Sequence, residues 1–222
     1  EDDTEDCNDS KKNYTDIDFA LRYTQKFNNN ESGIFVAEEH DEKYAQGKSF
    51  YALRSKQKVG TKTYGYFLTH VKNNFLNEKA TVNVFDYTNV KSDKLTLYTD
   101  VLASEKEGRS GLGLRSQFVY QVSAFKRRSG SIVYFEDDFE LNDFGYLKKR
   151  DWFHIGLGND FTKVDFNKNS SLEEREIAID FNYDSDTAGN SNPVTVRQEF
   201  NFTYNDTSEF QISWDLKTSG KD

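Results

Sequence analysis

Apolar and polar side chains alternate along most of this chain, and few folds accommodate so persistent a pattern. In PVTVRQEFNFTYND, Val196 and Phe200 share one face, whereas Arg197 and Glu199 share the other. Successive side chains of a β-strand project to opposite sides, so the segment predicts a strand with one apolar face. FQISWDLKTSG repeats the pattern, and the polar residues at 205–208 predict a hairpin turn between the two strands.

The same rule predicts about twelve strands and no helix. The expected strands are 16–27, 32–40, 48–58, 62–72, 79–89, 94–104, 112–123, 130–138, 151–161, 174–184, 194–205 and 208–219. Most of the links are short and contain Asn, Gly, Ser or Asp, and short links connect neighbouring antiparallel strands. The predicted fold class is therefore all-β, an antiparallel up-and-down meander.

Strand length favours part of a large transmembrane β-barrel over a soluble sandwich. The expected strands approach the roughly 9–11 residues that cross a bilayer at a tilt, whereas soluble strands average about 5–6. A water-filled lumen also accommodates the 30% of charged residues. Aromatic residues near strand ends are interpreted as girdles at the lipid headgroups, with filling of a sheet core as the alternative. They are Tyr14, Tyr23, Phe27, Tyr87, Tyr120, Trp152, Tyr183 and Tyr204.

Charge and cysteine content exclude several classes of protein. The net charge of −9 argues against a nucleic-acid partner, because phosphate binding needs clustered Lys and Arg. Cys7 is the sole cysteine, which excludes an internal disulfide and a thiolate metal cluster. The chain starts at Glu1 and has no methionine, so we expect an internal piece of a longer polypeptide. Residues 1–13 are predicted to be a disordered acidic leader and 14–222 a β-barrel domain fragment.

One stretch, DDFELNDFGYLKKRD at 137–151, interrupts the alternation. It resembles the signature of a family of Gram-negative outer-membrane β-barrel proteins catalogued as domain of unknown function 5916. That signature is Phe, any residue, a hydrophobic residue, Asn or Ser, Asp, a hydrophobic residue, Gly, Phe or Tyr, a hydrophobic residue, any residue, Arg, any residue and Asp. TDIDFALRYTQK, SGIFVAEEHDE, SFYALRSKQK and YGYFLTHV resemble earlier strands of the family in the same order. The resemblance covers roughly residues 14–161.

The resemblance implies a protein of the Gram-negative outer membrane that takes up, binds or displays saccharides. Outer-membrane lipid and a saccharide are then the expected partners. Family members carry an N-terminal domain similar to carbohydrate-binding modules of family nine, followed by the barrel. This chain has an acidic leader where relatives have a basic, glycine-containing segment. We expect the N-terminal domain to be missing from it, so the saccharide binding of that domain is not placed on residues of this chain. A soluble all-β binding module at the cell surface and a carbohydrate-active hydrolase are the alternative functions.

The interrupting stretch has a structural interpretation of its own. Asn142 and Asp143 can bond their own backbone, and Gly145 can adopt a positive φ, so the stretch predicts a turn that fixes strand register. Arg150 ends a basic triplet that could meet lipid phosphates. Alternatively, Arg150 pairs with Asp143 inside the lumen, or the motif contacts a substrate.

DFNKNSSLEERE at 165–176 follows most of a calcium-loop template. Asp165, Asn167, Asn169 and Glu176 occupy the first, third, fifth and twelfth positions. Ser170 replaces the glycine of the sixth position, and the flanks alternate like strands, which argues against an EF-hand. A plain polar loop is the default interpretation, and a loop that binds Ca²⁺ is the alternative. No other cofactor is predicted.

Motifs for catalysis are not evident. His40, His70 and His154 fall on separate strands or turns, without the spacing of a metal site or a triad. The carboxylate run at 136–138 could suggest glycoside chemistry, but two carboxyls must flank a sugar, and a run at a strand end is usually solvated. No catalytic residue is assigned.

Overall fold

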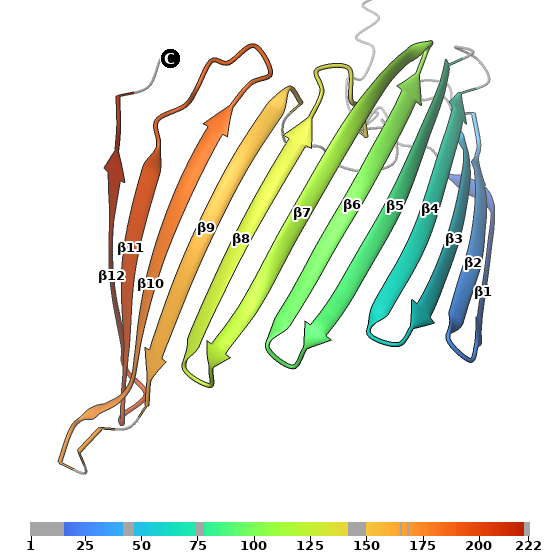
Figure 1. Ribbon diagram of the computed structural model, residues 1–222. Helices are drawn as coiled ribbons and strands as arrows, with labels where there is room; N and C mark the ends of the chain where they lie inside the picture. Colours follow the sequence, from blue (N-terminus) through green and yellow to red (C-terminus); the bar gives the residue numbers. More distant parts are fainter. Residues whose placement is uncertain are drawn as a thin grey trace, which may run out of the picture.

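The computed structural model describes residues 16–41, 47–73, 78–141, 150–164, 166–167 and 169–219. These residues form twelve β-strands in a single sheet (Figure 1). The strands are β1 (Ile17–Phe27), β2 (Asn30–Glu39), β3 (Ser49–Val59), β4 (Lys62–Asn73), β5 (Glu78–Ser92), β6 (Leu95–Lys106), β7 (Arg109–Ser123), β8 (Lys126–Phe135), β9 (Trp152–Lys163), β10 (Leu172–Ser185), β11 (Thr195–Tyr204) and β12 (Glu209–Lys217).

The strands follow one another across the sheet in chain order, and every neighbouring pair is antiparallel. The predicted all-β meander is confirmed. Several predicted boundaries differ by three or four residues, since β5 ends at Ser92 rather than near 89, β7 begins at Arg109 rather than near 112, and β8 runs from Lys126 to Phe135 rather than over 130–138. The end of β8 has a clear cause. The chain turns there, since the N–H of Phe139 donates to the carbonyl oxygen of Glu136 over 3.2 Å.

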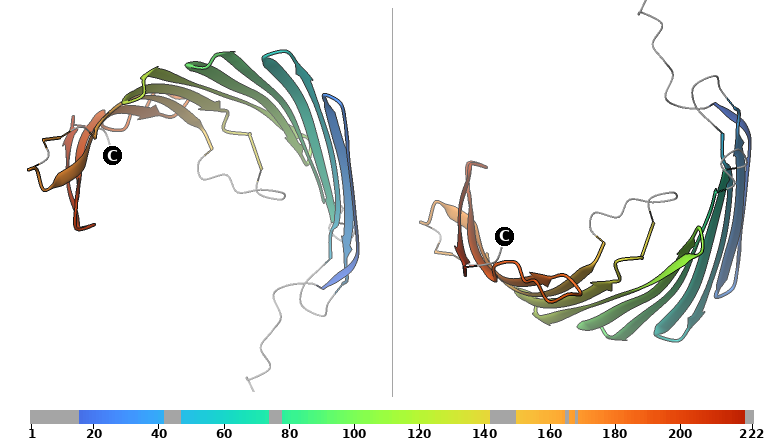
Figure 2. Two further views of the ribbon diagram at one scale, coloured as in Figure 1. Left: turned by 90° about the horizontal axis from the view of Figure 1, so that it is seen from below. Right: turned by 90° about the horizontal axis from the view of Figure 1, so that it is seen from above.

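The sheet bends into an open arc, with β1 and β12 at its two ends (Figure 2). Within the described residues, no hydrogen-bonded pairing joins β1 to β12. The described strands form one layer, so they do not build the two-layered sandwich considered as the soluble alternative. Each strand therefore has one side toward the inside of the arc and one side toward the outside.

The two edges of the sheet differ in their connections. At the lower edge of Figure 1, two residues each join β1 to β2, β3 to β4, β5 to β6 and β7 to β8, whereas the longer connections 164–171 and 205–208 join β9 to β10 and β11 to β12. At the upper edge most connections are longer, such as 40–48, 136–151 and 186–194. The tight exception joins β6 to β7, where Glu107 and Gly108 have φ of 51° and 79°. A type I′ turn requires positive φ at both central residues.

The strand pairing assigns every side chain to the concave or the convex side. Directly paired residues point to the same side of a sheet, and so do residues two positions apart on one strand. Phe139 lies in the β8–β9 connection, whose described ends lie inside the arc in Figure 2, and its ring stacks on Phe135 with centroids 4.9 Å apart. Phe135 and its partners Gly113 and Trp152 therefore mark the concave side.

The convex side carries mainly apolar side chains, and many of them are exposed. In the described strands, charged residues on this side lie within four residues of a strand end, as Lys62 does in β4 and Glu105 in β6. An uncharged apolar band thus crosses the middle of the convex side. Exposed members of the band include Leu21, Leu53, Phe85, Val101, Leu112, Leu114, Ile132, Leu157, Ile179, Ile212 and Trp214.

The apolar cluster of the described residues lies on the concave side. Its buried members are Leu102, Val133, Phe135 and Phe139, and Val84, Leu141 and Trp152 pack against them. Ala37, Val71 and Val82 are also buried on this side. The middle of the sheet is therefore covered from within by the β8–β9 connection, and the convex side has no comparable cover among the described residues.

Candidate functional site: the concave face and its inward segment

Ion pairs between neighbouring strands line the concave face. In each pair an arginine of one strand meets an aspartate of the next, so the charges stabilise the register while remaining partly solvated. The face is therefore polar and rich in fixed charge. The pairs and their Nε–Oδ distances are Arg115–Asp100 (2.8 Å), Arg127–Asp160 (2.7 Å) and Arg197–Asp215 (3.3 Å).

A fourth ion pair joins two strands that are not neighbours in the sheet. Arg54 on β3 donates to both carboxylate oxygens of Asp86 on β5, over 2.6 and 3.0 Å, and so crosses β4. Gly65 of β4 makes room for this contact, because a Cβ at that position would fall on the Asp86 carboxylate. A bidentate arginine–carboxylate pair is both stronger and more directional than a single hydrogen bond.

Residues 136–141, called here the inward segment, fold back onto the concave face of β6, β7 and β8. Phe139 is fully buried there, on top of Phe135. Gly111 and Gly113 of β7 permit this approach, since a Cβ at Gly111 would lie 2.3 Å from the backbone nitrogen of Phe139. A Cβ at Gly113 would lie 2.7 Å from the Phe135 ring and 3.3 Å from the Phe139 ring, so Gly113 makes room mainly for Phe135, on which Phe139 stacks.

Polar contacts hold the inward segment at both ends. The Glu136 carboxylate accepts the backbone N–H of Leu112 over 2.7 Å, and the N–H of Glu140 donates to Ser104 Oγ over 3.0 Å. Arg150 Nη1 donates to Glu140 Oε2, also over 3.0 Å. The segment is thus bonded to β6 and β7 as well as packed on them, which defines its position on the face.

Trp152, His154 and Asp184 form a polar cluster beside the inward segment. Trp152 Nε1 donates to Asp184 Oδ1 over 2.6 Å, and His154 Nδ1 lies 3.1 Å from the same oxygen. The Trp152 and His154 rings are 5.4 Å apart, and Trp152 also contacts Phe135. The cluster ties β9 to β10 and orients the indole, because a buried Trp N–H requires an acceptor.

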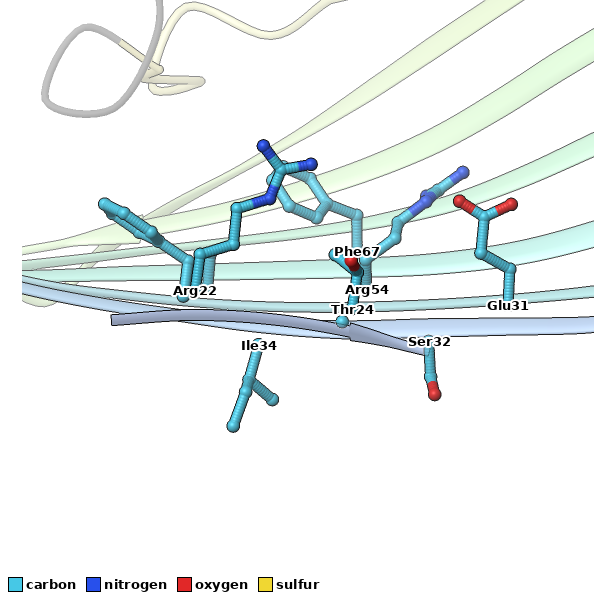
Figure 3. Close-up of a pocket in the computed structure, with 10 residues that line it drawn as sticks. Arg22, Thr24, Glu31, Ser32, Ile34, Arg54 and Phe67 are labelled. Carbon is cyan, nitrogen blue, oxygen red and sulfur yellow. The ribbon is translucent and has the colours of Figure 1, made fainter. Parts of the chain in front are cut away.

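A hollow of about 180 Å³ lies between the inner side chains of β1 to β4. Figure 3 shows Arg22, Arg54 and Phe67 standing on one side of the sheet, and Ile34 on the other. Gly33 lies on the floor of the hollow, and the Arg54 guanidinium lies 5.9 Å from the centre of the Phe67 ring. An aromatic wall beside cations suits polar or anionic solutes.

Charge is distributed unevenly along the concave face. On this face the strands β1 to β4 carry more basic than acidic residues, whereas the strands β9 to β12 carry more acidic than basic ones. A solute in the interior of the arc would therefore lie between surfaces of opposite sign. The basic residues of β1 and β3 are Arg22, Lys26, Arg54, Lys56 and Lys58, and the acidic residues of β9 to β12 include Asp160, Glu176, Asp180, Asp184, Glu199 and Asp215.

The predicted turn motif lies largely outside the described residues. Asn142, Asp143 and Gly145 are not among them, so their role as a register-fixing turn stays a prediction. Arg150 is described, and its carboxylate partner is Glu140. The alternative pairing of Arg150 with Asp143 is untested as well, because Asp143 lies outside the described residues.

The calcium candidates lie in or beside the β9–β10 connection. Asn167 and Asn169 belong to that connection, Glu176 lies within β10, and Asp165 is outside the described residues. In the described part of the chain, no group of three or more His, Cys, Asp or Glu side chains is placed to hold a metal ion. Calcium binding here remains a prediction, although residues 172–176 are a strand and not an EF-hand helix.

The histidines and the carboxylate run take structural positions. His40 Nδ1 lies 3.2 Å from Asp18 Oδ2, and His70 on the convex side lies 2.9 Å from Thr81 Oγ1. His154 is on the concave side. Glu136 bonds the β7 backbone, so the run at 136–138 is not simply solvated at a strand end.

The aromatic girdle prediction needs one correction. Trp152 does not face outward, because it pairs with Phe135 on the concave side and donates its N–H to Asp184. Tyr23, Tyr87 and other predicted members do lie on the convex side. Tyr14 lies outside the described residues.

Four residues that shape the concave face escaped the sequence analysis: Phe139, Gly65, Gly111 and Gly113. A signal for Phe139 was present, since Val84, Leu102, Val133 and Phe135 are apolar at positions where the alternation demands polar residues. The glycines at 111 and 113 are spaced two apart and so share one face. The sequence does not reveal that the apolar positions and the two glycines are neighbours, because that depends on the register between strands.

Comparison with protein-family models, with curated proteins and with solved structures found no match to this chain. None of the described residues forms a helix that is long and apolar enough to cross a membrane. The functional argument therefore depends on the two faces of the sheet.

Proposed function

We propose that this chain forms much of the wall of a large outer-membrane β-barrel, with the convex side against lipid and the concave side lining a watery lumen. The observation that carries the proposal is the uncharged apolar band on the convex side. In water, such an extended exposed apolar surface would be strongly unfavourable, because burial of apolar area drives folding. In a bilayer it is the expected outer surface of a barrel.

The strand ends and the connections also support a membrane orientation. The charged residues of the convex side lie near strand ends, where they would reach the headgroup region. Strands of 9 to 15 residues are long enough to cross the hydrocarbon layer at a tilt. Short turns at one edge and longer loops at the other are typical of outer-membrane barrels.

We propose small hydrophilic molecules as the solutes, with saccharides as the first class to test. The concave face offers paired charges, hydroxyls and glycines, and the hollow beside Phe67 and Arg54 combines an aromatic ring with hydrogen-bond donors. Aromatic rings beside planar polar groups suit sugar rings, which have apolar faces and hydroxyl edges. The resemblance to the outer-membrane family favours the same class.

The two tryptophans provide a test of the membrane proposal, because they lie on opposite sides of the sheet. Trp214 belongs to the convex band, whereas Trp152 is part of the concave cluster. We expect brominated lipids to quench the fluorescence of W152F, which keeps only Trp214, and to leave W214F, which keeps only Trp152, nearly unchanged. Aqueous acrylamide provides the converse control.

Heat-modifiable migration of the chain in SDS gives an independent measurement, since membrane barrels resist SDS at room temperature. A chain that is monomeric in water without detergent, with neither tryptophan quenched by lipid, would instead support the soluble binding module. Equal quenching of both tryptophans would contradict the assignment of the two sides.

A further inference from the structure

We infer that the inward segment narrows the lumen and sets the size of solute that passes, with Phe139 as its positioning residue. This inference rests on the proposed barrel and deepens it. Residues 136–141 leave the sheet at the end of β8 and lie inside the arc, above the middle of the concave face (Figure 2). They therefore occupy space that would otherwise belong to the lumen.

The concave face is built to receive this segment. A face exposed to water should be polar, yet β5, β6, β8 and β9 place Val84, Leu102, Phe135 and Trp152 in one inward-facing row. These side chains coincide with the area that Phe139 and Leu141 cover. The apolar row is thus explained by the segment that it binds, because exposed apolar area in a watery lumen would be unfavourable.

The glycines of β7 give a second, independent indication. Gly113 occupies the one position of the row that has no side chain, and Gly111 lies two residues away on the same side. Gly111 lets the backbone of the segment approach β7 closely, since an added Cβ would collide with the Phe139 nitrogen. Glycine within a strand weakens the strand and often marks a site where another backbone or a ligand approaches closely.

The position of the segment is fixed by contacts of different kinds. Phe139 is buried, the Glu136 carboxylate and the Glu140 N–H bond to β7 and β6, and Arg150 closes the connection by its ion pair with Glu140. Removal of one hydrogen bond would leave the others in place. Several independent contacts are expected for a segment that must keep the width of the lumen constant. They are not expected for a loop that is merely exposed to solvent.

The experiment is a liposome swelling assay with the complete barrel that contains this chain, reconstituted in phospholipid vesicles, and the probes are glycerol, glucose, sucrose and raffinose. Phe139→Ala should release the segment and increase the entry of sucrose and raffinose several-fold more than the entry of glycerol. Phe139→Leu should restore the size limit, because leucine still fills the apolar site. Gly111→Ala should act like Phe139→Ala without removing any apolar surface.

A matched control lies away from the segment. Phe85→Ala removes a phenyl ring from the convex band and so deletes the same group as Phe139→Ala. It should leave the order and spacing of the swelling rates unchanged. Folding of every variant is checked by heat-modifiable migration in SDS.

The outcomes separate this inference from the proposed function. Inserted, heat-modifiable variants with an unaltered size limit would overturn the inference and leave the barrel proposal standing. The same holds if neither the original chain nor Phe139→Ala admits any probe although both are inserted. A chain that fails to insert, with Trp214 unquenched by brominated lipid, would overturn the proposed function first.

Discussion

Strand β7 illustrates how differently the two faces of one sheet are made. On the convex side Leu112 and Leu114 are 55% and 37% exposed, with no charged side chain between them. One position away, Arg115 on the concave side is bonded to Asp100, and Gln117 lies beyond it. The same backbone thus presents an apolar surface to one medium and a charged surface to another.

The difference between the two faces affects how the exposure of apolar side chains is interpreted. Exposed apolar side chains in a soluble protein are scattered, and large contiguous patches mark contact with something else. Here the apolar positions recur on strand after strand and are bounded by charges at the strand ends. The concave face, by contrast, has an apolar row in its middle, and the inward segment covers that row. A charge introduced on the convex side should therefore change the free energy of unfolding more than a charge introduced on the concave side.

The largest effect is expected from a charge in the middle of the convex band. Leu114→Arg should lower the free energy of unfolding from the bilayer by about 2–4 kcal/mol, the cost of an arginine that faces lipid near the midplane. Gln117→Arg, on the other side of the same strand, should change it by only about 0.5 kcal/mol. Denaturant titration in lipid vesicles measures the free energy of unfolding of both variants. Equal decreases in the two variants would contradict the assignment of the faces.

The concave ion pairs should differ among themselves according to their exposure. Asp86→Asn should cost about 1.5–3 kcal/mol, because the side chain of Asp86 is 18% exposed and holds Arg54 through two bonds. Asp215→Asn should cost about 0–1 kcal/mol, since its pair with Arg197 is longer and more exposed. Denaturant titration of the two variants at low and high salt ranks them, and the reverse order would be inconsistent with this account.

The smallest effect concerns the turn between β11 and β12. The Ser208 hydroxyl and N–H both donate to Asp206 Oδ1, over 2.6 and 3.0 Å, which lowers the pKa of Asp206 below its ordinary value of 3.8. A lowered folded-state pKa stabilises the turn above the unfolded pKa, and that contribution is lost as the pH falls through the folded pKa.

The stability difference between the original chain and Asp206→Asn should therefore shrink on acidification from about pH 5 to pH 2. Ser208→Ala should raise the pKa of Asp206 back toward its ordinary value, because the first of the two donors is removed. Denaturant titration across this pH range measures both variants. A difference that does not vary with pH would contradict the proposed cause.

Much of the fold could be predicted from the alternation alone. All twelve strands lie close to their predicted ranges, and the faces of the last hairpin were assigned correctly, with Phe200 opposite Ile212 on one side and Arg197 opposite Asp215 on the other. These features are local, because the period of two belongs to each strand by itself. The hairpin turns follow from their Asn, Gly and Asp residues for the same reason.

The contents of the concave face could not be predicted in this way. The contact of Phe139 with Phe135 and the approach to Gly111 depend on the register of three neighbouring strands. The contact of Arg54 with Asp86 depends on a glycine in the strand between them. The choice between an outer girdle and the filling of a core was left open for Trp152, because the residues at a strand end do not by themselves reveal which side the strand turns inward.

The sequence by itself determined that the chain forms long antiparallel strands with one apolar and one polar side, since both properties follow from the order of neighbouring residues. Only the tertiary structure decided that these strands curve as a single layer with the polar side inward, and that the chain after β8 returns to cover an apolar row. The physical reason is that curvature and cover depend on which residues of separate strands become neighbours, and pairing across a sheet establishes those neighbours.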